Sequence, residues 1–146
     1  MNYTIVAHNA NYIPPVQKPL PSFYTEVGEQ GIRDLLDRLY LELDESPIRN
    51  IFPVKDRDGM RKAGQVSADF FIQICGGPDY FNQNRGMPQM RGRHAPFTIT
   101  PEGRLHWLTC FETAMKPLEE KISKESLQSF WNYINVFSIM MINTQG

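Results

Sequence analysis

The chain has 146 residues, enough for one domain with its own hydrophobic core. Hydrophobic residues make up 41% of it and charged residues 21%, and 15 basic residues nearly balance 16 acidic ones, which leaves a formal net charge of -1. This composition is typical of a soluble globular protein. It provides no overall field that would favour binding to nucleic acid or to an anionic membrane, so we expect neither as a partner.

Export and membrane signals are missing from both ends of the sequence. Residues 1–6 lack the basic region and the long apolar stretch of a signal peptide. Residues 136–142, the most apolar stretch near the end, are far shorter than the roughly 20 residues that span a bilayer. Cys75 and Cys110 have no CxxC spacing, which favours buried free thiols over a disulfide. We therefore expect a cytoplasmic protein.

Residues 1–22 differ in composition from the rest of the chain. Pro14-Pro15 and residues 19–21 concentrate proline among Asn, Gln and Lys. Proline at this density disfavours helix and favours extended backbone. We predict a proline-rich N-terminal extension that is either disordered or lies across the surface of a domain formed by residues 23–146.

Two long stretches after this extension carry apolar residues at helical spacing. The first stripe, in a helix expected from Gly28, consists of Ile32, Leu35, Leu36, Leu39, Tyr40 and Leu43. The second stripe consists of Met60, Ala63, Val66, Ser67, Phe70, Phe71 and Ile74. Between them, Ser46-Pro47 stops the first helix and starts a short piece that ends at Phe52-Pro53. Gly76-Gly77-Pro78 ends the second helix.

The second half of the chain combines an irregular segment with two further helices. Residues 79–93 are the least periodic, with a short helix expected after Pro88 through His94. Thr100-Pro101 and Ser123 are helix starts. The expected buried faces are Leu105, Leu108, Phe111, Ala114, Met115 and Leu118, then Leu127, Phe130, Trp131, Ile134, Phe137 and Met141. Because no strand pattern is present, we predict an all-α fold.

Of the three histidines, His94 is the candidate ligand. His8 lies in the extension, where we expect it to be solvated, and His106 lies toward the edge of a helix. A lone histidine is more often a surface or hydrogen-bonded residue than a ligand, and one histidine cannot form a zinc site. It does suffice for haem, whose porphyrin supplies four nitrogens. Arg91 and Arg93 could pair with haem propionates, although a solvated basic turn explains them equally well.

Motifs of other active-site classes are missing from the sequence. GxSxG, Walker A, GxGxxG and HExxH patterns do not occur. Nine Phe, six Tyr, two Trp and seven Met would suit a large flat ligand, but they would equally suit the core of an ordinary helical bundle.

An ordered set of short segments resembles the second group of truncated haemoglobins. The segments are Phe23-Tyr24, Val27-Gly28, Asp37-Arg38-Leu39-Tyr40, Gly76-Gly77-Pro78, Arg85-Gly86-Met87-Pro88, Arg91-Gly92-Arg93-His94-Ala95-Pro96-Phe97 and Trp107-Leu108-Thr109-Cys110. The resemblance covers roughly residues 22–120 without interruption. It implies a shortened globin fold, in which a two-over-two helical sandwich encloses haem.

The resemblance also implies roles for individual residues. His94 matches the proximal iron ligand, while Tyr40 and Trp107 match distal donors to bound oxygen. Plain core packing is the alternative for these two donors. The other matched haem contacts are Phe52, which packs on the porphyrin, Arg93, which pairs with a propionate, and the neighbouring residues Arg91, Met90 and Phe97. Ala63 matches the small residue at the distal gate. Ser67 departs from the family, since a larger apolar or amide side chain often stands there, and it would widen the pocket or add a weak donor.

The function implied is binding of dioxygen and other diatomic ligands at ferrous haem iron. Nitric oxide oxidation and peroxide reduction are further candidate reactions. The sequence has no flavin or nicotinamide motif, so sustained turnover would need an external reductase. The alternative is a globin-shaped sensor or interaction module that uses residues 1–22 to bind a partner.

Overall fold

The computed structural model describes residues 1–9 and 12–145, and this part of the chain is mostly helical. The elements are α1 (Pro21–Asp44), the short 3-10 helix η1 (Arg49–Ile51), α2 (Arg57–Ile74), α3 (Tyr80–Arg85), α4 (Met90–His94), α5 (Pro101–Met115), the 3-10 helix η2 (Lys116–Leu118) and α6 (Lys124–Met141). Within the described ranges the only strand-like feature is one isolated bridge between Asn9 and Tyr12. The predicted all-α fold is confirmed.

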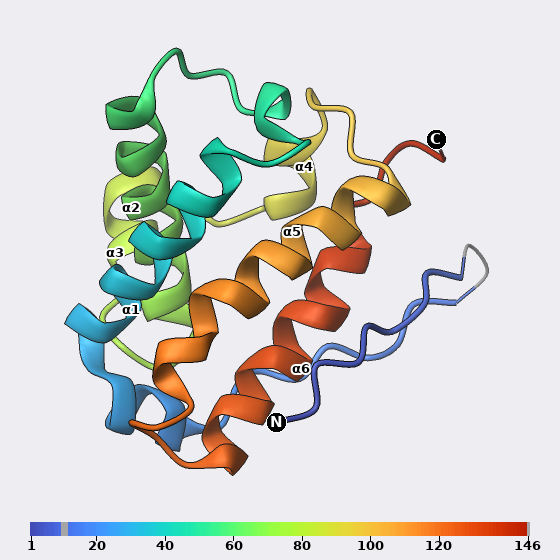
Figure 1. Cartoon of the computed structure of the whole chain (residues 1–146). Helices are drawn as coiled ribbons and strands as arrows, with labels where there is room; N and C mark the ends of the chain where they lie inside the picture. The colour runs from blue at the N-terminus through green and yellow to red at the C-terminus, as the bar shows by residue number, and fades with distance from the viewer. Residues whose placement is uncertain (10–11, 146) are drawn as a thin grey trace.

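Two pairs of helices form the body of the molecule. α1 packs against α2, α5 packs against α6, and α1 also contacts both α5 and α6. Figure 1 shows α1, α2 and α3 on one side and α5 and α6 on the other, with the short α4 near the C-terminal end of α6. The apolar faces of these helices meet in one core that is rich in aromatic side chains. None of the helices in residues 1–9 and 12–145 has the length and apolarity that a membrane crossing requires.

α1 begins earlier than its sequence pattern predicts. The helix starts at Pro21, and Gly28 interrupts it with φ 76° and ψ 170°. Residues with a side chain rarely adopt such a positive φ, whereas glycine does so at little cost, and Gly28 therefore permits the kink. After the kink, all six residues of the predicted stripe are buried. The chain therefore changes direction once at Gly28, and only then does α1 follow the expected face.

α2 approaches α1 closely at Gly64. A Cβ at this position would lie 3.0 Å from the Tyr40 ring and 3.2 Å from the Leu36 carbonyl oxygen. Of the predicted α2 stripe, only three residues are fully buried, namely Met60, Phe70 and Phe71. The rest of the stripe stays partly exposed, and two of its residues, Val66 and Ser67, border hollows described below.

The last two long helices follow their predicted caps. Thr100 and Ser123 accept hydrogen bonds from the amides three residues later, and the predicted α6 face is buried. One expectation for α5 is wrong, because Leu105 is 45% exposed and its neighbour Arg104 is 3% exposed. At this end of α5 the Arg104 side chain, not Leu105, continues the buried face, and its guanidinium is satisfied by hydrogen bonds described below.

The irregular segment is more ordered than predicted. α4 confirms the short helix through His94, but α3 was not expected. Its sequence is rich in Asn and Gln, and tertiary hydrogen bonds fix it: the Gln73 side chain bonds both the amide and the side chain of Asn82, at 3.0 Å each.

The N-terminal extension lies along α6. Figure 1 shows it running beside this helix and returning toward α1. Of the two arrangements predicted, the described residues adopt the one across the surface; residues 10 and 11 lie outside them. The expectation that His8 is solvated is wrong, because both ring nitrogens are buried without a hydrogen bond to any described residue. Cys75 and Cys110 are free and buried, as predicted.

Candidate functional site

A cavity of about 310 Å³ lies between the helices. Its walls are mainly apolar and come from α1, η1, α2, α3, α4, α5 and α6. Of the residues predicted for the site, those that line it are Tyr40, Phe52, Ser67, Met90, Arg93, His94, Phe97 and Trp107. Residues that are 67 positions apart in sequence thus meet at one place.

Arg91 and Ala63 are not part of the cavity lining. Arg91 is exposed, and Ala63 is partly buried on α2, one turn before Ser67. The structure therefore brings eight of the ten predicted residues together and leaves these two outside.

His94 has one ring nitrogen fixed and the other free to act. Its Nδ1 lies 2.7 Å from the Met90 carbonyl oxygen, one helical turn earlier in α4. A carbonyl only accepts, so Nδ1 carries the proton and donates it. Of the two neutral tautomers, this contact selects the one whose Nε2 holds a lone pair, the form in which histidine binds metals. The short helix α4 thus presents an oriented single ligand at the cavity.

A pair of hydroxyl groups lies in the wall formed by α1 and α2. The Tyr40 hydroxyl and Ser67 Oγ are 2.8 Å apart, and either can donate. Burial raises the pKa of Tyr40, so the hydroxyl keeps its proton at neutral pH. The ring is held edge-on against Phe52, with centroids 5.7 Å apart. Ser67 thus provides the partner that a buried tyrosine hydroxyl needs.

Trp107 and Phe111 form a second aromatic contact at the cavity. Trp107 is partly buried on α5, and its ring meets Phe111 at 79° with centroids 4.8 Å apart. Phe111 is fully buried, so it anchors the indole from the core side. Trp107 therefore adds an N–H donor to a wall that already holds two hydroxyl groups.

Arg93 bonds to backbone carbonyls of the irregular segment. Its Nε donates to Pro88 O at 2.6 Å, and its Nη2 donates to Arg85 O at 2.8 Å and Met87 O at 3.0 Å. The guanidinium also lies over the Phe81 ring, 4.9 Å from its centroid. These contacts tie α4 to the end of α3. The predicted pairing of Arg93 with a propionate stays a prediction.

Several lining residues were not identified from the sequence. The apolar ones are Ile48, Ile51, Phe70, Phe71, Phe81, Ile99, Phe137 and Met141, and they are inseparable from core residues by pattern alone. Two arginines, Arg85 and Arg104, also line the cavity. Arg104 lies in a predicted helix, where a charged residue looks like a solvated position, and Arg85 lies in the segment predicted to be irregular, so no local pattern marked either one as part of the cavity wall.

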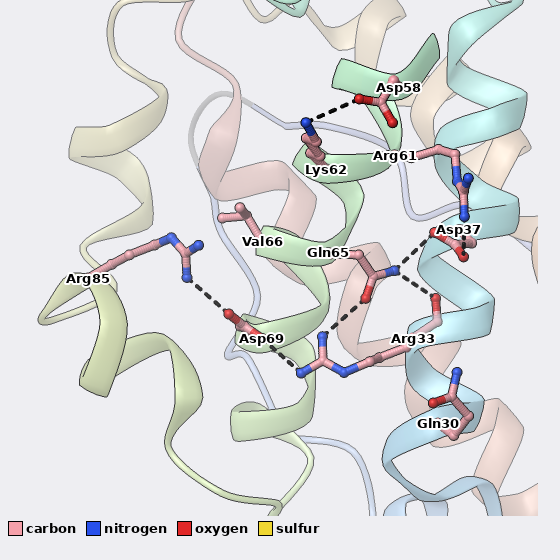
Figure 2. Close-up of a pocket in the computed structure, with 10 residues that line it drawn as sticks. All are labelled: Gln30, Arg33, Asp37, Asp58, Arg61, Lys62, Gln65, Val66, Asp69 and Arg85. Atoms are coloured by element: carbon pink, nitrogen blue, oxygen red, sulfur yellow. Dashed lines mark hydrogen bonds and ion pairs between the residues drawn. The ribbon is translucent and has the colours of Figure 1, made fainter.

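A second hollow of about 610 Å³ lies outside the first and is polar. Figure 2 shows side chains of α1, α2 and α3 bridged across it: Arg85 and Arg33 both bind Asp69, at 2.9 and 3.0 Å, and Gln65 binds Asp37 at 3.0 Å. Val66 and Arg85 line both hollows. We call this outer hollow the polar groove.

The inner cavity fits a haem. Its apolar and aromatic walls suit a flat macrocycle, and His94 provides one oriented axial nitrogen. Among the described residues, no three His, Cys, Asp or Glu side chains gather to hold a metal ion directly. One histidine in an apolar cavity is the donor set that a porphyrin iron requires and that a bare metal ion does not accept.

Comparison with known proteins gives an independent result. The family model described as bacterial-like globin matches residues 22–143. Group 2 truncated hemoglobin YjbI of Bacillus subtilis is 36% identical over 93 residues, which cover 63% of this chain and 67% of that protein. The predicted resemblance to second-group truncated haemoglobins is thereby confirmed.

Solved structures agree with the predicted architecture. Phosphate-bound Hell's gate globin IV matches with a TM-score of 0.85 and 34% identity, covering 98% of this chain and 88% of that one. A truncated oxygen-avid haemoglobin from Bacillus subtilis matches with a TM-score of 0.75 and 27% identity, covering 84% of this chain and 99% of that one. These structures confirm the predicted truncated globin fold.

Proposed function

The chain belongs to the bacterial-like globin family, and from this premise we propose that it binds dioxygen by means of a haem held in the inner cavity. Membership in a globin family implies haem binding. The observation that carries the proposal is the Nδ1 contact of His94 with Met90 O at 2.7 Å, in a cavity that also holds the Tyr40 and Ser67 hydroxyl groups. When bound, haem supplies a ferrous iron that coordinates diatomic ligands.

His94 would supply the nitrogen ligand to the haem iron, and its neighbours would hold the macrocycle. The carbonyl of Met90 fixes the imidazole and strengthens the basicity of Nε2. Phe52, Met90 and Phe97 provide apolar contact with the porphyrin. We assign Arg93 to a haem carboxylate, since its Nη1 is the terminal nitrogen that the three backbone contacts do not use.

The hydroxyl pair and the indole supply polar contacts to the ligand. O–H and N–H donors in a site shielded from water would stabilise negative charge on a bound diatomic ligand. If Ser67 donates to Tyr40, the phenol proton is left to point into the cavity. Ser67 therefore orients the Tyr40 donor, and Trp107 offers a second one. The similarity to a haemoglobin described as oxygen-avid supports this assignment.

Catalytic use of the bound oxygen would be an addition to this minimal function. Nitric oxide oxidation and peroxide reduction both need electrons returned to the iron, and we assign that supply to an external reductase. A cytoplasmic location is part of the same proposal. The alternative is a sensor or interaction module that uses residues 1–22 to bind a partner; Asn2, Val6 and Leu20 of this segment are hydrogen-bonded to α6.

The test is an absorption spectrum of the purified chain with added haem. We expect a Soret band that His94→Ala abolishes or shifts to the position of haem without a protein ligand. His106→Ala is the matched control, because His106 does not line the cavity and its side chain is 36% exposed. An unchanged Soret band in His94→Ala would overturn the proposal, as would identical losses in both variants.

A further inference from the structure

Arg104 is a buried cation in the wall of the inner cavity. It lies on α5 with 3% of its surface exposed, in the same cavity wall as Phe137 and Ser138 of α6. Its hydrogen-bond partners are all neutral: Nε donates to Ser138 Oγ at 2.8 Å, and Nη2 donates to the carbonyl and side-chain oxygens of Asn135 at 2.7 and 2.9 Å. Burial lowers the pKa of Arg104 to about 10, so the side chain stays charged at neutral pH.

The charge of Arg104 is not neutralised by the protein. Among the described residues, no carboxylate lies within ion-pair distance of this guanidinium, whereas Arg33, Arg49, Arg57, Arg61 and Arg85 each have one. Burying an arginine without a counter-ion costs free energy unless its N–H groups are all occupied. Arg104 is thus a positive charge held in a largely apolar cavity wall by neutral hydrogen-bond partners alone.

The remaining partner of Arg104 comes from the N-terminal extension. Nη1 donates to the carbonyl oxygen of Val6 at 2.8 Å, across 98 residues of sequence. We call residues 1–9 the strap. Asn135 joins the two features, because its Oδ1 accepts from both the Val6 amide, at 2.9 Å, and Arg104.

Further hydrogen bonds fix the strap to α6 on the N-terminal side of Val6. The Thr4 carbonyl accepts from Trp131 Nε1 at 3.2 Å and from Asn135 Nδ2 at 2.8 Å. The Asn2 amide donates to Gln128 Oε1, and Gln128 Nε2 donates back to the Asn2 carbonyl, both at 2.9 Å. The strap thus supplies a fixed acceptor for the buried guanidinium.

A fixed positive charge in a wall of low polarity changes the energetics of an iron in the same cavity. Reduction from ferric to ferrous removes one positive charge, so a nearby cation repels the reduced form less. Burial and polarity around the iron are among the means by which a protein sets its potential. We propose that the strap fixes Arg104 in the cavity wall and that this cation favours the ferrous, oxygen-binding state of the iron. The inference rests on the proposed haem function.

The first experiment measures the one-electron reduction potential of the haem-loaded full chain, with mediator dyes as electron donors. Arg104→Met removes the charge at similar volume, and Arg104→Lys keeps the charge with fewer donors. We expect the ferrous-to-ferric ratio at a given applied potential to fall about tenfold in Arg104→Met, a shift of about 59 mV for one electron. Arg104→Lys should stay close to the unmodified chain. Equal potentials in all three proteins would overturn the inference.

The second experiment perturbs the strap from its exposed side. Val6 is 39% exposed, and Val6→Pro removes the amide that donates to Asn135. Val6→Ala is the matched control because it keeps that amide. We expect Val6→Pro to lower the potential, by less than Arg104→Met does, and to have no further effect when combined with Arg104→Met. Val6→Pro and Val6→Ala with the same potential would refute the strap's part.

The two proposals fail in different ways. A normal Soret band with unchanged potentials in the Arg104 variants refutes only the inference about Arg104. A missing Soret band in the unmodified chain refutes the haem function, and the inference with it.

Discussion

The inner cavity and the polar groove adjoin each other, yet they differ in chemistry. The groove is larger, about 610 Å³ against 310 Å³, but charged and amide side chains bind one another across it. The cavity is smaller and apolar, and its few polar groups are held at fixed positions. Both share Val66 and Arg85. Volume alone therefore does not identify a ligand-binding site. Polar groups held in fixed orientations within an apolar wall are the better indicator.

Among single substitutions, we expect those at the polar groups of the cavity to change the oxygen dissociation rate the most. Tyr40→Phe and Trp107→Phe should each speed dissociation of oxygen, since each removes a buried hydrogen bond worth on the order of 1–3 kcal/mol. Stopped-flow mixing of the oxygenated protein with a ligand competitor measures this rate. Ser67→Ala should produce a smaller increase in the same rate, because it removes only the partner that orients Tyr40.

Tyr80→Phe is the matched control for this prediction. The Tyr80 hydroxyl also donates a hydrogen bond, to Glu29 Oε1 at 2.8 Å, but it lies outside the cavity. We expect its oxygen dissociation rate to equal that of the unmodified chain. If Tyr40→Phe and Trp107→Phe both behave like this control, the assignment of the distal donors is wrong.

A smaller effect, on the stability of the fold, is expected from a substitution at the close contact between α1 and α2. Gly64→Ala places a methyl group 3.0 Å from the Tyr40 ring and 3.2 Å from a backbone oxygen, so α1 and α2 must separate slightly. We expect the free energy of unfolding in urea to fall by about 1–3 kcal/mol, which is the usual cost of overpacking. Gly92→Ala, with nothing within 4 Å of the added methyl, is the control and should cost nothing. Equal stability of the two variants would contradict the close contact at Gly64.

The parts of the fold that could be predicted are those set by local pattern. The stripes of α1 and α6, the caps at Thr100 and Ser123, and the end of α4 follow from periodicity and capping chemistry over a few residues. The same reasoning failed for α3, whose polar sequence is held by the distant Gln73.

The candidate site likewise contains residues that could be predicted from the sequence and residues that could not. The residues alone indicated His94 only as a possible ligand, because haem needs a single histidine. The family resemblance then assigned it the proximal position and indicated Tyr40 and Trp107. Arg104 was not identifiable, because its burial depends on Val6 and Asn135, 98 and 31 residues away. A pairing of this kind leaves no local pattern, since either partner alone looks like an ordinary surface residue.

The smallest effect is expected in the polar groove. Arg33→Gln removes an ion pair with Asp69 and a hydrogen bond to Gln65, yet the Arg33 side chain is 24% exposed and the pair is partly screened by water. The free energy of unfolding should fall by about 1 kcal/mol or less, and by less still in high salt. Arg61→Gln is the control, because its contact with Asp37 is longer, 3.9 Å, and the Arg61 side chain is 58% exposed.

Neither groove variant should change the oxygen dissociation rate, because neither Arg33 nor Arg61 lines the cavity. Measuring that rate beside the unfolding free energy separates the two hollows. An increase in Arg33→Gln as large as that in Tyr40→Phe would mean that the Arg33–Asp69–Arg85 bridge controls the cavity through the wall that Arg85 shares. The groove would then have to be treated as part of the site.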